Sequence, residues 1–172
     1  MPFSHVTGPY NVLATLYAWL QTQLAANLPP LLTTARLVLE MPIDPLETPC
    51  YSIHLLSIDS EASPYLGSMG DGTCGEHKFG ICEVNCWISR RVPYWRAQLN
   101  QMHDALMKAV LGARSQGSAI VIKDFYTNAE APTNTTYRIV LDRIETQATL
   151  PDPNPDIERR RVLIYFSWFE RT

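Results

Sequence analysis

The chain has 172 residues, of which 46% are apolar and 18% are charged, and its formal net charge is −3 at pH 7. This length suits one domain that buries its own core, so we expect residues 1–172 to form a single domain. The negative charge argues against a general nucleic-acid binder, which normally carries a basic stripe. Four tryptophans and eight tyrosines in a charge-poor chain indicate apolar surface that a partner covers.

The first half of the chain predicts one helix followed by three strands. Leucines recur at helical spacing over residues 9–27, and prolines stand in the first turn and just after the end. Alternating apolar residues predict strands over 35–42, 50–59 and 77–89. A polar, glycine-rich loop over 60–76 separates the last two of these strands.

The apolar run inside the first helix, residues 11–20, is too short to span a bilayer. A secretory signal would carry Lys or Arg ahead of such a run, and neither precedes it here. We therefore expect no membrane association and a protein made in a cytoplasm, where its four cysteines stay free thiols.

The second half of the chain repeats the pattern of the first. Apolar residues at helical spacing predict an amphipathic helix over 93–115, and strands are expected over 119–126, 136–150 and 160–170. The order is therefore helix, three strands, helix, three strands. This order predicts an α+β fold, in which two amphipathic helices pack on a mixed, largely antiparallel sheet.

The last predicted strand is apolar on both of its faces. Its alternate residues form two sets, Val162, Ile164, Phe166 and Trp168 on one face and Leu163, Tyr165 and Phe169 on the other. A strand that is apolar on both faces is covered on both faces. The helices cover one face, and either a second internal layer or a neighbouring subunit covers the other.

A short stretch, 70–87, contains the residues that most resemble a metal site: Cys74, His77, Cys82 and Cys86. Their ligand chemistry suits zinc. Cys82 and Cys86 fall in one predicted strand, however, and lie about 13 Å apart at about 3.3 Å per residue. The sulfurs of a tetrahedral zinc site lie within about 4 Å of each other. We therefore predict that these two thiols are small buried hydrophobes and that the chain holds no metal.

The same stretch contains a GxGxxG pattern formed by Gly70, Gly72 and Gly75. That pattern binds nucleotides when a strand precedes it and a helix follows. Here a loop precedes it and a strand follows, so no cofactor is expected. His54 and His103 stand among apolar residues without a converging partner, and we predict no catalytic site.

The order of elements resembles the tail terminator (tail completion, or head–tail joining) proteins of long-tailed bacteriophages. The likeness is carried by "FGICEVNCWISRRVPYWRAQLNQMHDALMKAVL", where a strand ends near a proline and opens a helix, and by the closing strand "RRVLIYFSWFE". The resemblance implies a structural virion protein at the neck. Such a protein forms a hexameric ring on the last ring of the tail tube protein, stops tube polymerisation and presents a surface to the head–tail connector protein. Genomic DNA only passes through the lumen.

The resemblance also suggests which residues make contacts. The loops 60–76 and 127–135 are expected to make the axial contacts, because long loops in a compact domain are usually functional. The candidate interface or lumen residues are Asp59, Glu61, Asp71, Phe166 and Trp168. Other readings stay open, namely another head–tail connector or a tail-tube subunit, an adaptor that binds a peptide at a strand edge, and a small enzyme that depends on zinc or a thiol.

Overall fold

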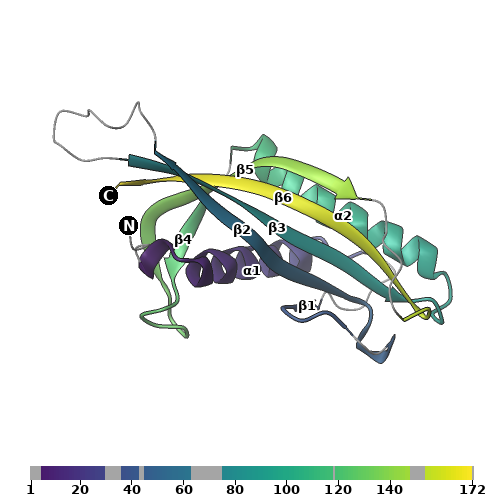
Figure 1. Cartoon of the computed structure of the whole chain (residues 1–172). Coiled ribbons are helices and arrows are strands. Elements are labelled where there is room, and N and C mark those ends of the chain that lie inside the picture. The colour runs from purple at the N-terminus through teal and green to yellow at the C-terminus, as the bar shows by residue number, and fades with distance from the viewer. Residues whose placement is uncertain are drawn as a thin grey trace.

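The computed structural model describes residues 5–29, 36–42, 45–62, 75–117, 119–147 and 154–171. The predicted order of helix, three strands, helix, three strands is confirmed (Figure 1). Two 3₁₀ turns, η1 (His5–Thr7) and η2 (Pro45–Glu47), accompany these elements. The bounds are α1 (Pro9–Ala26), β1 (Leu37–Val38), β2 (Cys50–Ala62), β3 (Gly75–Ser89), α2 (Trp95–Ser115), β4 (Ile120–Asp124), β5 (Thr133–Gln147) and β6 (Ile157–Arg171).

The strands form a six-stranded sheet in the order β1-β2-β3-β6-β5-β4. Only the β1–β2 pair is parallel, and the other pairs are antiparallel, as the predicted mixed, largely antiparallel sheet requires. Register shifts interrupt the ladders between Leu55 and Ser57 on β2 and between Leu141 and Arg143 on β5. Such bulges bend a strand locally and change the direction of its side chains.

Several strand boundaries differ from the prediction; β5 covers Thr133–Gln147 where a strand is predicted over 136–150, so it includes the last residues of the predicted loop 127–135. β1 covers two residues where the sequence predicts a strand over 35–42, and the chain bends at Leu39 and Glu40, ahead of Pro42. A proline has no N–H to donate to a ladder, which limits strand extension at that point. The β2–β3 hairpin is longer than predicted, because Glu61 pairs with His77 and Ala62 with Glu76. The predicted loop therefore gives its first and last residues to strands.

Both helices pack on one face of the sheet, which we call the inner face, and share one hydrophobic core with it (Figure 1). Leu16, Leu20 and Leu24 of α1 and Met102 and Leu106 of α2 are almost fully buried there. Burying one such side chain contributes about 1.5–3 kcal/mol relative to leaving it in water. None of the described helices is long and apolar enough to cross a lipid bilayer.

A buried amide joins α1 to the end of β4. Asn11 is fully buried, and its Nδ2 donates to the carbonyl of Val6 and to Asp124 Oδ1, both at 3.1 Å. Its Oδ1 accepts from the backbone N–H groups of Phe125 at 2.8 Å and of Tyr126 at 3.1 Å. The amide therefore fixes the start of the β4–β5 connection against the first helix.

Candidate interaction surface

The face of the sheet opposite the helices, the outer face, carries exposed apolar side chains. Phe169 is 60% exposed, Val140 51% and Phe79 38%, and the half-buried Ile81 and Tyr165 lie on the same face. We call these five residues the outer apolar patch. Both described helices pack on the inner face, so neither of them covers this patch. A second internal layer, one of the two alternatives that the sequence left open, does not occur over the patch within the described residues.

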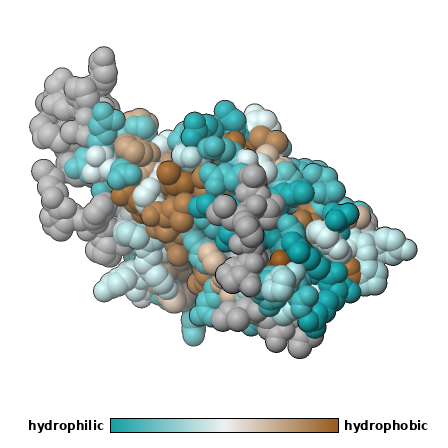
Figure 2. Space-filling view, turned by 45° about the vertical axis from the view of Figure 1, so that its right-hand side comes forward, coloured by the Kyte–Doolittle hydropathy of each residue, from teal (hydrophilic) through white to brown (hydrophobic). Residues whose placement is uncertain are grey.

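Apolar surface is concentrated rather than evenly spread in the space-filling view, where a hydrophobic area interrupts a mostly hydrophilic surface (Figure 2). On the strands, the large apolar side chains that are more than a third exposed are Leu56, Phe79, Val140 and Phe169. Exposed apolar residues grouped in this way are typical of interaction surfaces. The chain therefore offers sheet surface suited to a macromolecular partner.

A hollow of about 380 Å³ lies beside the outer apolar patch, across four strands. Phe79, Ile81 and Tyr165 contribute the apolar part of its lining, and Asp59 and Asp142 contribute carboxylates. Asp59 follows the β2 bulge, and Asp142 is the extra residue of the β5 bulge. Neither forms an ion pair with another described residue, and we call this feature the acidic hollow.

Arg143 also lines the acidic hollow, but its charge is balanced locally. Its guanidinium carbon lies 4.1 Å from the centre of the Tyr165 ring, and its Nη2 lies 3.4 Å from Glu145 Oε2. The Tyr165 hydroxyl donates to the same Glu145 oxygen at 3.0 Å. The arginine therefore belongs to an ordered stack at one side of the hollow and leaves the two aspartates uncompensated.

The predicted interface residues fall into three groups. Phe166 and Trp168 are 0% and 1% exposed on the inner face, so they pack the core and offer no contact surface. The prediction that they lie at an interface is wrong, because alternation along β6 points them to the inner face, where they pack in the core shared with both helices. Asp59 and Glu61 are exposed on β2, as a contact residue requires. Asp71 lies outside the described residues.

Sequence reasoning did not single out Phe79, Ile81 and Val140. The register places them on the outer face beside β6, because Phe79 pairs with Ser167, Ile81 with Tyr165 and Val140 with Ser167. Residues of neighbouring strands that pair in this way point to the same side. The pairing of β3 with β6 joins distant parts of the chain, and no local pattern reveals it.

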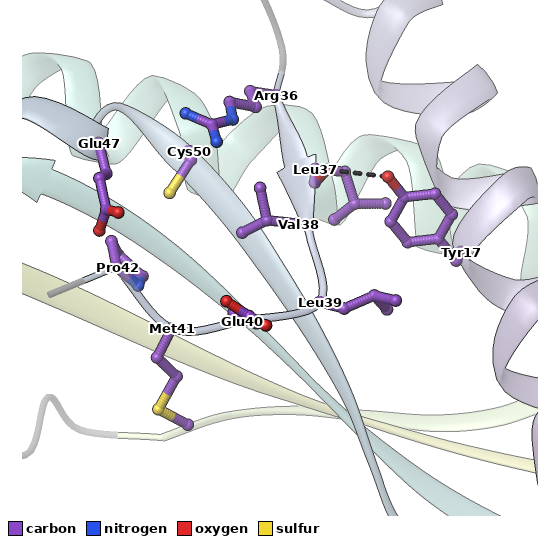
Figure 3. Close-up of a pocket in the computed structure, with 10 residues that line it drawn as sticks. All are labelled: Tyr17, Arg36, Leu37, Val38, Leu39, Glu40, Met41, Pro42, Glu47 and Cys50. Atoms are coloured by element: carbon purple, nitrogen blue, oxygen red, sulfur yellow. Dashed lines mark hydrogen bonds between the residues drawn. The ribbon is translucent and has the colours of Figure 1, made fainter.

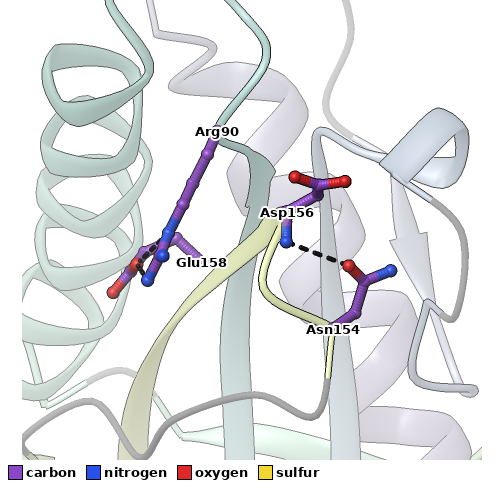
Figure 4. Close-up of polar contacts among 4 residues, drawn as sticks. All are labelled: Arg90, Asn154, Asp156 and Glu158. Carbon is purple, nitrogen blue, oxygen red and sulfur yellow. Dashed lines mark hydrogen bonds and ion pairs between the residues drawn. The ribbon is translucent and has the colours of Figure 1, made fainter.

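A second surface feature is the turn between β3 and α2, residues 90–96, which we call the basic turn. Arg90 Nε donates to Glu158 Oε2 at 2.8 Å (Figure 4). The Nη2 of Arg91 is paired with Asp156. The Arg90 N–H also donates to the Asp156 carbonyl oxygen at 2.7 Å. Asn154 Oδ1 accepts a hydrogen bond from the Asp156 N–H at 2.9 Å and orders the turn 154–156 that leads into β6. The basic turn is therefore held rigidly against the start of β6.

Tyr94 is the most exposed large apolar or aromatic side chain among the described residues, at 81%. Its φ is 58° and its ψ is 26°, a left-handed conformation that is unusual for an aromatic residue. The helix predicted from residue 93 starts at Trp95, because the backbone of Tyr94 adopts the left-handed conformation and cannot belong to a right-handed helix. Arg96 lies 4.9 Å from the Trp95 ring centre, so an aromatic pair flanked by arginines marks the start of α2.

The cysteines are placed as the strand geometry predicted. Cys82 and Cys86 are free, fully buried and on the inner face, and Cys50 is a free buried thiol on β2. Burial raises the pKa of Cys50 to about 11 and that of Cys82 to about 12, and it also raises the pKa of Cys86. The thiolate is the form that attacks or binds metal, so at neutral pH these groups act as apolar packing.

His77 does not approach the buried thiols. It points to the outer face and stacks on Phe169, with 4.6 Å between the ring centres. Within the described residues, no three or more His, Cys, Asp or Glu side chains form a group that fits a metal ion. Cys74 lies outside the described residues.

Polar side chains of β2, β3 and β6 form a network on the outer face, toward the end of β3 that is farther from the acidic hollow. Glu83 Oε2 lies 2.5 Å from Arg161 Nη2, and Glu83 Oε1 accepts from Asn85 Nδ2 at 2.7 Å. Ser52 Oγ lies 3.2 Å from His54 Nε2. Ser52 and Asn85 are fully buried in this network, and Asn85 Oδ1 is left without a hydrogen-bond partner among the described residues.

A further pocket of about 390 Å³ lies beside β1 (Figure 3). Tyr17 closes one side, and its hydroxyl donates to the Leu37 carbonyl oxygen at 3.0 Å. Arg36, Glu47 and Cys50 line the pocket together with apolar side chains. Because the pKa of Cys50 is raised to about 11, its thiol stays protonated at neutral pH and supplies no activated nucleophile.

Comparison of the chain with protein-family models and with curated proteins finds no match.

Proposed function

We propose that this chain is a structural protein of a long-tailed bacteriophage virion, a tail terminator that forms a ring on the end of the tail tube. In this role it stops tube polymerisation and joins the tail to the head–tail connector protein. Its partners are copies of itself in a hexamer, the tail tube protein and the connector, and genomic DNA passes through the lumen.

One observation carries the proposal. The outer apolar patch lies on a sheet face that both described helices leave open, and a neighbouring subunit is a natural cover for such a surface. A ring subunit needs two different patches, one on each side, and the basic turn and the acidic hollow are two patches of unlike chemistry. The α+β order of elements is also the one that the resemblance implies.

The charge of the chain is compatible with a DNA-conducting ring. A net charge of −3 limits attraction to phosphates, which cationic side chains would hold. Asp59 and Glu61 are exposed and remain proposed lumen or ring-contact residues. Reversing their charges is expected to impair ring assembly or DNA passage, and normal assembly with normal passage would remove them from the proposal.

The first test is native mass spectrometry of the purified chain across a concentration series. We expect a metal-free hexamer to accumulate as the concentration rises. A monomer with one bound zinc ion would contradict the proposal and favour the zinc- or thiol-dependent enzyme. Long open tubes formed by the chain alone would identify a tail-tube subunit instead.

The second test measures capping directly. Added during polymerisation of the tail tube protein of the same virus, the chain is expected to shorten the tubes seen by negative-stain electron microscopy. Phe169→Ser, which removes a 60% exposed member of the outer apolar patch, should weaken capping. Leu111→Ser, a matched change at a 44% exposed position on α2, should leave capping unchanged. Equal tube lengths with and without the wild-type chain would refute the proposed function.

A further inference from the structure

We propose that the basic turn of one subunit docks into the acidic hollow of a second copy of this chain, with Tyr94 as the inserted side chain. The proposal rests on the proposed ring and names the two patches that would build it. Contacts between unlike patches leave one free patch of each kind at the ends of an open assembly, and a suitable rotation closes such an assembly into a ring.

The basic turn has the properties of an anchor. Tyr94 is 81% exposed and held in the left-handed region, so its backbone is strained while its ring gains little burial within its own subunit. Strained backbone positions are concentrated at functional sites. Ion pairs of Arg90 with Glu158 and of Arg91 with Asp156 hold the turn in place. A fixed, exposed tyrosine beside arginines matches the residue types that dominate binding energy at protein interfaces.

The acidic hollow has the properties of a receptor for that side chain. Phe79, Ile81 and Tyr165 provide apolar and aromatic surface for a ring, and Asp59 and Asp142 provide acceptors for a hydroxyl group. Tyrosine combines an apolar body with one polar end, and such side chains are suited to a site that is apolar inside and polar at its rim. No described helix fills the hollow from within the subunit.

The two patches also have opposite charge. The basic turn has three arginines against the two carboxylates of Asp156 and Glu158, which leaves one positive charge in excess. In the acidic hollow, Arg143 is balanced by Glu145, and the charges of Asp59 and Asp142 remain. Opposite potentials accelerate the encounter of two surfaces and fix their register.

A subunit cannot fill its own hollow with its own turn. Ile81, in the hollow, lies eight residues before Ser89, the last residue of β3 ahead of the basic turn. At about 3.3 Å per residue this is roughly 26 Å along one strand. The turn lies at the far end of β3 in Figure 1. The tyrosine therefore meets a hollow only on another molecule.

The test uses two variants of the full chain and their mixture. Tyr94→Gly removes the anchor, and glycine adopts a positive φ readily, so this variant keeps the fold. The double variant Asp59→Arg/Asp142→Arg changes two exposed residues and makes the hollow repel the basic turn. Sedimentation velocity is expected to find each variant monomeric, with self-association weakened at least about tenfold.

The mixture is the decisive measurement. The Tyr94→Gly variant keeps an intact hollow, and the double variant keeps an intact turn, so an equal mixture should form a one-to-one heterodimer that grows no further. Tyr126→Ala, at another strongly exposed tyrosine, and Asp104→Arg, at an exposed carboxylate of α2, should assemble like the wild-type chain.

Three results would overturn the docking proposal: a wild-type chain that stays monomeric at its highest soluble concentration, variants that assemble normally, or a mixture without heterodimer. The capping measurement separates this proposal from the proposed function. A wild-type chain that caps tubes while Tyr94→Gly still assembles rejects the docking proposal alone. A chain that assembles through Tyr94 but leaves tube length unchanged rejects the terminator function alone.

Discussion

Gly80 is a position where the structure leaves little room for a larger side chain. It lies in β3 opposite Phe166 of β6, at the centre of the sheet. A Cβ atom placed on Gly80 would lie 2.6 Å from Phe166 Cζ, 2.9 Å from Cε2 of the same ring and 3.0 Å from the Ser57 carbonyl oxygen. Carbon atoms in favourable contact lie about 3.5–4.0 Å apart. The ring must therefore move by about 1 Å within a closely packed core.

Gly80→Ala is expected to destabilise the fold by about 1–2 kcal/mol. Overpacking a core costs about 1–3 kcal/mol, and the lower backbone entropy of alanine offsets about 0.5–1 kcal/mol of this. Urea unfolding should show a lower midpoint with an unchanged slope, and the melting temperature should fall by roughly 2–4 °C for each kcal/mol.

Gly112→Ala is the matched control, because its Cβ would meet no heavy atom within 4 Å on α2. This change should stabilise the fold by about 0.5–1 kcal/mol. The contact itself is tested by the double variant Gly80→Ala/Phe166→Leu. Its loss of unfolding free energy should be smaller than the sum of the losses of the two single variants, by about 0.5 kcal/mol or more. A neutral or stabilising Gly80→Ala, or strict additivity in the double variant, would refute the reasoning.

Three further predictions concern buried polar groups. Iodoacetamide at about pH 8 should leave Cys50, Cys82 and Cys86 unmodified in the native protein, because burial raises the pKa of each thiol, and should modify them after denaturation. Peptide mass spectrometry detects any adduct, and labelling of these sites in the native protein would contradict their burial. Burial lowers the pKa of His54 and of His103, so the folded state favours the neutral imidazole. The contribution of these two groups to the free energy of unfolding is complete above about pH 6.5 and is lost as the pH falls below that value. Urea midpoints should therefore fall less on acidification in His54→Gln and His103→Gln than in the wild-type chain, and identical pH profiles would count against the assignment. Asn11→Ala should cost about 1–3 kcal/mol, because it leaves two backbone N–H groups and a carboxylate without their amide partner; hydrogen exchange at Phe125 and Tyr126 should accelerate, and unchanged rates there would show that the amide does not fix this connection.

The strands and helices follow largely from local pattern. Alternation along β3 places Cys82 and Cys86 beside Val84 in the core, and leucine spacing places α1 on the inner face. The partners across the sheet do not follow from local pattern, because β3 pairs with β6 although α2, β4 and β5 lie between them in the sequence. For that reason the sequence identified Phe166 as a candidate interface or lumen residue, whereas its ring is buried against Gly80.

The acidic hollow shows a second limit of sequence reasoning. It depends on two bulges, at Leu56 and at Asp142, and each bulge changes which residues face outward beyond it. No proline or glycine marks either position. Asp59 was nevertheless identified as a contact candidate, from the resemblance to ring-forming proteins, and its exposure beside the hollow agrees with that role.

The position of β6 has a consequence for synthesis of the chain. β6 follows every other strand in the sequence, yet it lies between β3 and β5 in the middle of the sheet. While the chain emerges from the ribosome, β3 and β5 each present an unpaired edge until residues 157–171 arrive. Unpaired edges of this kind favour association with other chains during folding. Chains that end before β6 therefore lack the strand that joins the two halves of the sheet, and aggregation is the expected fate of such fragments.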